Sequence, residues 1–164
     1  MKQKKRWIIL AAVCAATAVT AAAGLDQTLV TRTYSISTDK LSQPIRLALL
    51  TDLHSCTYGL GQRDLLDAVD AVHPDLVLLG GDMIDDDPTL DADNAWTVLQ
   101  ALGTTYPTFY VTGNHEVWSG QAEAWKERID ALGITVLEGE CATVVVQGQP
   151  LNLCGVDDPA VGEM

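Results

Sequence analysis

The chain has 164 residues, enough for one domain of ordinary size and too few for two independent domains together with a membrane segment. Apolar residues make up 48% of it and charged residues 20%, a globular composition that excludes a disordered acidic tail. From Asp26 onward only six Lys and Arg stand against 22 Asp and Glu, which excludes a DNA-, RNA- or lipid-headgroup-binding module that works through a basic patch.

The N-terminal 25 residues form a segment of their own. Four cations stand in the first six residues: Lys2, Lys4, Lys5 and Arg6. The uncharged run from Trp7 to Leu25 follows, and as a helix its nineteen residues just span a bilayer core of about 30 Å. The cations keep the N-terminus in the cytoplasm, so we predict a signal anchor over residues 1–25 and an exported domain over residues 26–164. A signal peptide cleaved at Ala21–Ala23 remains the alternative.

Strands and helices alternate along the exported part. Alternating β-branched residues over 31–37 predict an edge strand, and the apolar run 45–50 predicts a strand buried on both faces. Apolar residues at helical spacing predict a helix over 62–72, and a second buried strand follows over 76–79.

The same rhythm continues to the end of the chain. We predict a helix over 94–102, a strand over 108–111, a helix over 119–132, a strand over 134–137, and a hairpin of strands 143–146 and 151–154. This order predicts an α/β domain with a largely parallel sheet and helices on its faces. In such sheets, ligands bind at the carboxyl ends of the strands.

Chemically active residues follow three of the predicted strands. Asp52 and His54 follow the first, and the alternation of an extended segment points both side chains the same way. Asp82 follows the second strand after paired glycines, which allow close approach of the backbone. Asn114 and His115 follow the third strand after another glycine. All three strand ends share one edge of the sheet, so we expect these side chains to converge.

Carboxylate, amide and imidazole groups form a mixed oxygen and nitrogen set. It suits Mn, Fe, Zn, Ni or Co and is too rich in nitrogen for calcium. Two such ions need a bridging carboxylate, and Asp82 at the central strand end is our candidate for it. The pair would polarise a phosphoryl oxygen and yield hydroxide for in-line attack on phosphorus. His115 would protonate the leaving oxygen or stabilise charge on the phosphorane.

The three strand ends together resemble the first three blocks of a known superfamily, the calcineurin-like metallophosphoesterases. The blocks are Asp52-x-His54, Gly81-Asp82-x-x-Asp85 and Gly113-Asn114-His115-Glu116, about 30 residues apart. With the N-terminal anchor and Gly155-Val156-Asp157-Asp158, the sequence is similar to the bacterial membrane-associated phosphodiesterase branch over roughly residues 45–158. The resemblance implies a four-layer α/β/β/α sandwich, preceded here by one transmembrane or signal helix.

The resemblance also implies a role for each residue of the blocks. Asp52 and His54 would bind the first of two divalent transition-metal ions, Asp82 would bridge, and Asn114 would bind the second. His115 would act catalytically on the phosphate. Asp85 and Glu116 would support these groups through hydrogen bonds.

The sequence departs from the family's pattern downstream. His54, His73 and His115 are the only histidines, so the later lone His and the GHxH block are missing. The resemblance therefore implies an N-terminal portion of the domain, with an incomplete sandwich.

We predict a metal-dependent phosphoesterase, favouring phosphodiesters, that acts outside the cytoplasm. It would be tethered to the cell membrane, or secreted if the signal is cleaved. Its substrate would be a small or lipid-linked phosphoester, and it would have no nucleic-acid partner. A sugar or nucleotide phosphomonoesterase and a truncated, non-catalytic metal-binding fragment are the alternatives. The residues leave the substrate, the metal and the oligomeric state open.

Three further features have expectations of their own. The four cysteines show no metal-binding spacing, so we expect small buried or idle thiols, with a Cys141–Cys154 disulfide as the alternative. The acidic run 85–93 lacks the residues of a calcium loop and is expected to be a solvated loop. Trp118 and Tyr58 are candidates for lining a substrate cleft.

Overall fold

The computed structural model describes residues 7, 13–14, 17 and 28–163. The predicted anchor therefore lies almost wholly outside the described residues, and the division into residues 1–25 and 26–164 stays a prediction. Within the described part of the chain, we find no helix with the length and apolar character needed to cross a membrane. The chain divides into compact units at residues 1–32 and 33–164, and the fold described below is that of the second unit.

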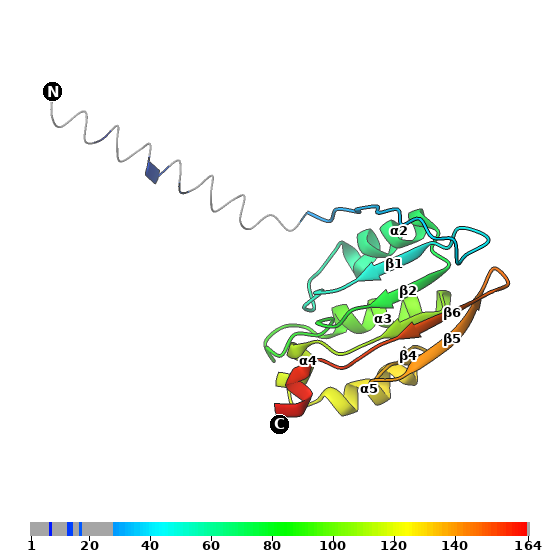
Figure 1. Ribbon diagram of the computed structural model, residues 1–164. Helices are drawn as coiled ribbons and strands as arrows, with labels where there is room; N and C mark the ends of the chain where they lie inside the picture. The colour runs from blue at the N-terminus through cyan, green and yellow to red at the C-terminus, as the bar shows by residue number, and fades with distance from the viewer. Residues whose placement is uncertain (1–6, 8–12, 15–16, 18–27, 164) are drawn as a thin grey trace. The chain divides into compact units, whose positions relative to one another are not determined.

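A parallel sheet of four strands forms the centre of this unit (Figure 1). Its strands lie in sequence order and are β1 (Leu47–Leu50), β2 (Leu76–Leu79), β3 (Thr108–Tyr110) and β4 (Thr135–Val136). All three neighbouring pairs are parallel. The predicted parallel sheet is confirmed, and the carboxyl ends of β1, β2 and β3 meet at one edge.

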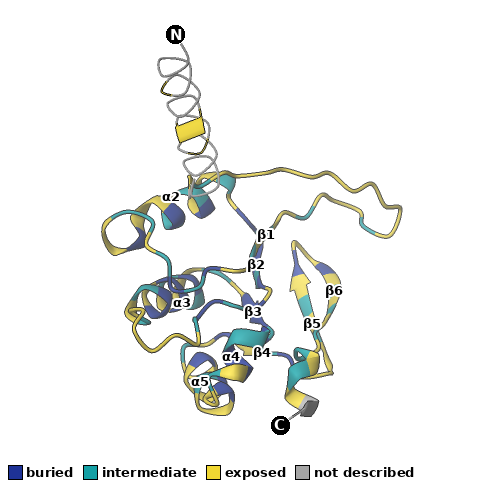
Figure 2. Ribbon diagram, turned by 90° about the vertical axis from the view of Figure 1, so that its left-hand side faces the viewer, coloured by how far each residue is buried: buried dark blue, intermediate teal, exposed yellow. Residues whose placement is uncertain are grey.

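Helices join the strands and cover one face of the sheet (Figure 2). They are α2 (Arg63–Val72), α3 (Asp93–Thr105) and α5 (Ala122–Asp130), with the short α4 (Asn114–Trp118) and the 3-10 helix η1 (Leu60–Gln62). A second 3-10 helix, η2 (Pro159–Glu163), follows the last strand. The apolar residues at helical spacing face the core as expected. Those buried are Leu65 and Val69 of α2 and Val98, Leu99 and Leu102 of α3.

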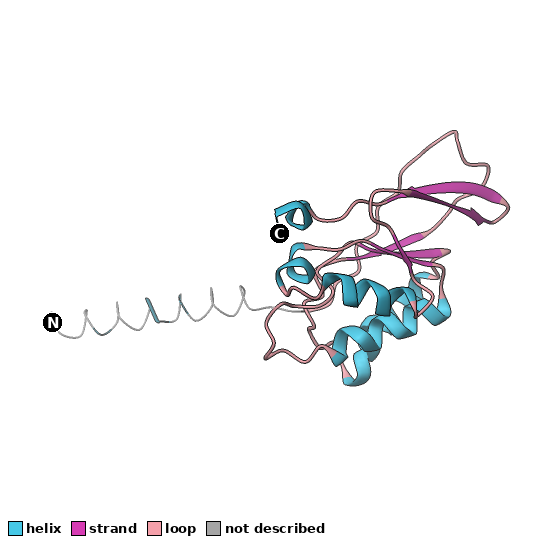
Figure 3. Cartoon of the chain, turned by 90° about the horizontal axis from the view of Figure 1, so that it is seen from below, coloured by secondary structure: helices cyan, strands magenta, loops and turns pink. Residues whose placement is uncertain are grey.

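The other face carries a hairpin of β5 (Cys141–Val146) and β6 (Gln149–Cys154) (Figure 3). Leu76, Phe109, Leu137 and Val146 form the apolar core between hairpin and sheet. The described residues thus form three layers: helices, parallel sheet and hairpin. The prediction of helices on both faces is wrong for this part of the chain, where the second face is covered by strands, and a fourth layer is not among the described residues.

Two strand predictions are corrected by the structure. Residues 31–37 are exposed and form no strand, because β-branched residues stabilise a strand only where a neighbour supplies hydrogen bonds and packing. β1 forms as predicted but is not buried on both faces. Leu47 and Leu49 are 46% and 67% exposed, because β1 is an edge strand and the hairpin packs on Leu76 and Phe109 of the central strands.

The expectation of idle thiols is wrong for Cys141 and Cys154, which form a disulfide. The hairpin register places the two cysteines opposite each other, with their Cα atoms 4.0 Å apart. Spacing in the sequence did not show this, because the pairing follows from the turn between β5 and β6 and not from a cysteine motif. Cys56 is a free, half-buried thiol.

Candidate metal centre

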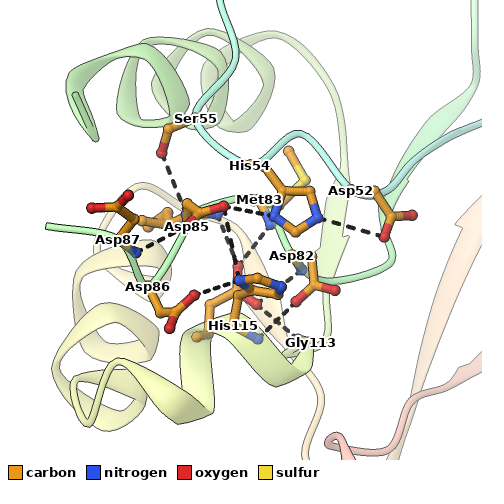
Figure 4. Close-up of polar contacts among 12 residues, drawn as sticks. Asp52, His54, Ser55, Asp82, Met83, Asp85, Asp86, Asp87, Gly113 and His115 are labelled. Atoms are coloured by element: carbon orange, nitrogen blue, oxygen red, sulfur yellow. Dashed lines mark hydrogen bonds and ion pairs between the residues drawn. The ribbon is translucent and has the colours of Figure 1, made fainter. Parts of the chain in front are cut away.

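The backbone remains paired where the chain leaves β1 and β2. The Asp52 N–H donates to the Gly81 carbonyl (3.1 Å), and the His54 N–H donates to the Asp82 carbonyl (2.9 Å). The Ser55 N–H donates to the Met83 carbonyl (3.1 Å). The first two predicted blocks are therefore hydrogen-bonded to each other, which brings their side chains to one place (Figure 4).

The backbone at this place is not extended, contrary to the expectation for Asp52 and His54. Asp52, His54 and Asp82 have φ angles of 56°, 46° and 51°, in the left-handed region. Such a conformation costs a non-glycine residue about 1–2 kcal/mol, so three of them are held by the surrounding hydrogen bonds. Strain of this kind is concentrated at functional sites.

Two glycines let the second and third loops touch. Gly81 has a φ of 88°, and a Cβ atom on it would lie 2.7 Å from the Gly113 Cα. A Cβ atom on Gly113 would lie 2.5 Å from the Asp82 Cγ. The close approach predicted for the glycines before Asp82 is thus between the backbones of two neighbouring loops. A side chain at Gly81 or Gly113 would push Asp82 away from His115.

The Glu116 carboxylate is completely buried and joins the same two loops. Its Oε1 accepts the N–H groups of Met83 (2.7 Å) and Ile84 (3.0 Å). Its Oε2 accepts those of Asp82 (2.9 Å) and Gly113 (2.8 Å). Four charge-assisted hydrogen bonds compensate for the loss of hydration at this carboxylate. Glu116 therefore supports the centre, as the resemblance implied, by holding the backbone of these two loops in place.

His54, Asp82 and His115 form the centre of a possible ligand group. Each offers one ligand atom, and these atoms all lie within 4.8 Å of one another. The His54 Nε2 lies 3.9 Å from the Asp52 Oδ1, and the two imidazole rings are 4.4 Å apart, edge to face. Asn114 directly precedes His115 as the first residue of α4. The structure thus brings three of the five predicted residues together, with Asp52 next to His54 and with Asn114 adjacent to His115 in the chain.

Two carboxylates orient the histidines. The Asp85 Oδ2 lies 3.0 Å from the His54 Nδ1. This pairing favours a proton on Nδ1 and leaves the lone pair of Nε2, on the side of Asp52, available to bind a metal ion. The Asp86 Oδ1 lies 2.6 Å from the His115 Nδ1. Asp86 was expected in a solvated loop, and its contact with His115 had no signal in the sequence beyond membership of an acidic run.

The charge of the cluster favours a bound cation. In the described part of the chain, the only basic groups within ion-pair distance of Asp52, Asp85 and Asp86 are His54 and His115. Carboxylates gathered at a partly buried site without Lys or Arg repel one another, and a divalent ion relieves this repulsion. Asp85, Asp86 and His115 form a second possible ligand group. The mixed donor set therefore fits a divalent transition metal.

Trp118 borders the cluster. Its ring centroid lies 5.3 Å from that of His115, and 62% of the residue is exposed. Trp118 is thus an exposed aromatic side chain next to the cluster, and it remains a candidate for contact with the substrate.

The family model for calcineurin-like phosphoesterases matches residues 45–156. The chain belongs to this family. The resemblance predicted from the three blocks is confirmed, and so is the assignment to the metallophosphoesterases.

Several known proteins are similar to this chain. An uncharacterized metallophosphoesterase of Helicobacter pylori is 37% identical over 125 residues, which are 73% of this chain and 31% of the relative. Phosphodiesterase YaeI of Escherichia coli is 30% identical over 73% of this chain and 46% of its own length. A transmembrane protein with metallophosphoesterase domain from Danio rerio is 28% identical over 70% of this chain and 27% of its own length.

Among solved structures, the phosphopantetheinyl hydrolase PptH of Mycobacterium tuberculosis aligns with a TM-score of 0.45 and 18% identity, over 66% of this chain and 41% of that one. The Helicobacter pylori comparison spans less than a third of the relative's length.

Proposed function

We propose that the protein hydrolyses phosphoesters with the help of divalent metal ions and that phosphodiesters are its substrates. The observation that carries the proposal is the convergence of His54, Asp82 and His115 at one sheet edge, in a chain of this family. The name of the Escherichia coli relative supports the phosphodiester class.

The residues divide between holding metal and handling the substrate. Asp52 and His54 would hold one ion, Asp82 would be shared, and Asn114 would hold the other. When bound, two such ions polarise a phosphoryl oxygen and acidify a water molecule. His115 would exchange a proton with the leaving oxygen, and Asp86 holds its Nδ1 so that Nε2 is free for this role.

The two ions would have different numbers of protein ligands and therefore different affinities. Asp52, His54 and Asp82 serve the first ion, whereas only Asp82 and Asn114 are assigned to the second. A site with two protein ligands binds a divalent ion weakly. For this 164-residue chain we therefore expect weak metal binding and little or no turnover, and the activity proposed above is that of the whole protein.

We also propose that the domain lies outside the cytoplasm, tethered by residues 1–25. The cations before the apolar run support this topology, and so does the Cys141–Cys154 disulfide, since disulfides persist in oxidising compartments. Protease added to intact cells should digest the domain. Protection of the domain until the cells are lysed would contradict the topology.

The activity is tested on the whole protein by hydrolysis of bis-p-nitrophenyl phosphate and p-nitrophenyl phosphate with added Mn²⁺ after chelation. Asp82→Ala should reduce diester hydrolysis by about tenfold or more, because the shared carboxylate serves both ions. Asp39→Asn, at an exposed position outside the cluster, is the matched control and should leave the rate unchanged. An Asp82→Ala rate within about threefold of wild type would remove Asp82 from the reaction.

A further inference from the structure

A buried lysine joins three parts of the chain. Lys126 of α5 is 6% exposed, and its Nζ lies 2.6 Å from Glu138, 2.8 Å from Asp157 and 3.1 Å from Glu123. Burial by itself lowers the pKa of Lys126, but the hydrogen bonds to these carboxylates, led by that to Asp157, outweigh it and raise the pKa. The lysine therefore remains charged and holds the segment after β6 against α5.

Asp157 extends this contact to the end of β3. Its Oδ2 accepts from Lys126, and its Oδ1 accepts the Thr112 hydroxyl (2.7 Å). The Thr112 hydroxyl oxygen in turn accepts the N–H of Asp158 (3.3 Å). Thr112 is 4% exposed, so these are interior hydrogen bonds with little competition from water.

The segment that carries Asp157 is seated tightly. A Cβ atom on Gly155 would lie 2.6 Å from the Leu137 Cβ and 2.6 Å from the Val111 Cγ1. Only glycine allows the chain to pass this close to Val111 and Leu137. The position of Asp157 is therefore fixed by packing as well as by its polar contacts.

Thr112 is directly connected to the residues of the centre. It precedes Gly113, whose N–H donates to Glu116 (2.8 Å), and the His115 N–H donates to the Asp82 Oδ1 (2.9 Å). A shift of Thr112 would therefore be passed to the hydrogen bonds that place Asp82. Such a shift should matter at a metal centre, because the positions of the ligand atoms determine the affinity for the metal.

We propose that Asp157 is a positioning residue for the metal centre, which fixes the Gly113–Glu116 turn through Thr112 and is itself held by Lys126. The inference rests on the proposed function for its consequence on metal binding. It gives a role to Gly155-Val156-Asp157-Asp158, which contributes no atom to the possible ligand groups found among the described residues.

The test compares four variants of the full chain. Thr112→Val removes the hydroxyl with little change of shape, and Thr112→Ser keeps it. Asp157→Asn keeps the size of the side chain but removes its charge. Glu123→Gln is the matched control, because Glu123 contacts the same lysine with a side chain that is 81% exposed. Calorimetric titration with Mn²⁺ measures metal affinity, and hydrogen exchange with mass spectrometry measures the protection of residues 113–116.

Thr112→Val and Asp157→Asn should weaken Mn²⁺ binding by about tenfold or more, the effect usual for partners of metal ligands. They should also speed exchange over residues 113–116, while Thr112→Ser and Glu123→Gln stay within about twofold of wild type. Unchanged exchange in Thr112→Val, or an equal effect of Glu123→Gln, would overturn the proposal. If the wild type bound no Mn²⁺, the proposed function would fail, and hydrogen exchange alone would decide on the role of Asp157.

Discussion

At the level of single residues, the centre depends on side chains that are not themselves assigned as ligands. Glu116 accepts four backbone N–H groups from two loops, and Asp85 and Asp86 each hold one imidazole. Ligands held in this way are placed before a metal arrives, which lowers the cost of binding it.

Replacement of Glu116 by Ala should reduce the free energy of unfolding by about 3 kcal/mol or more, because four buried N–H groups lose their acceptor. Urea denaturation followed by circular dichroism measures this. Glu127→Ala, at an exposed position of α5, should change it by less than about 0.5 kcal/mol. A loss below about 1 kcal/mol in Glu116→Ala would show that the loops hold without the carboxylate.

Tyr110 should make the fold sensitive to alkaline pH. Its hydroxyl is buried, and burial together with the charge of the nearby Glu116 carboxylate raises its pKa above 10.0. The unfolded chain loses this proton first, so the stability that Tyr110 contributes is complete below pH 10 and falls as the pH rises further.

Tyr110→Phe should therefore lose less stability than wild type when the pH is raised from 7 to 9 and then to 11. Urea denaturation at the three pH values provides the comparison. Tyr34→Phe, at a position that is 81% exposed, should behave as wild type. An alkaline loss in Tyr110→Phe as large as that of wild type would contradict this account.

At the level of elements, the site is made by the ends of β1, β2 and β3 and by the loops that follow them. The loops come together because Gly81 and Gly113 allow direct backbone contact. On the other side of the sheet, the Cys141–Cys154 disulfide closes the open end of the hairpin just before the segment of Asp157. Closing a loop of this size stabilises a fold by about 3 kcal/mol in the chain-entropy description.

Gly81→Ala should separate steric contact from backbone strain when it is compared with Gly120→Ala. Both glycines have positive φ, 88° and 70°, but only a Cβ atom at Gly81 would meet another loop, since nothing lies within 4 Å of one at Gly120. Gly81→Ala should therefore cost at least about 2 kcal/mol more than Gly120→Ala in thermal or urea unfolding. Equal costs would show that the loops separate easily.

At the level of the whole molecule, the parallel sheet and the convergence of its strand ends could be predicted from the sequence. Apolar runs and helical spacing are local, and the edge at which Asp52, His54, Asp82 and His115 meet follows from parallel topology. Burial of Lys126 and the contact of Asp86 with His115 could not be predicted, because both depend on packing between distant segments.

The errors have the same origin. Leu49 has the apolar character of a buried strand residue, and its exposure is decided by where the hairpin lies. The left-handed backbone of Asp52 and His54 is set by hydrogen bonds to the next loop and leaves no pattern in the sequence.

The central claim is that the strand ends form a divalent-metal centre, and the most direct measurement is calorimetric titration of the metal-free chain with Mn²⁺. Wild type should bind saturably, and His54→Ala should bind at least about tenfold more weakly, since it loses a ligand held by Asp85. His73→Ala, which changes an exposed histidine at the end of α2, should bind as wild type does. No saturable binding by wild type, or equal binding by His54→Ala and His73→Ala, would contradict the claim.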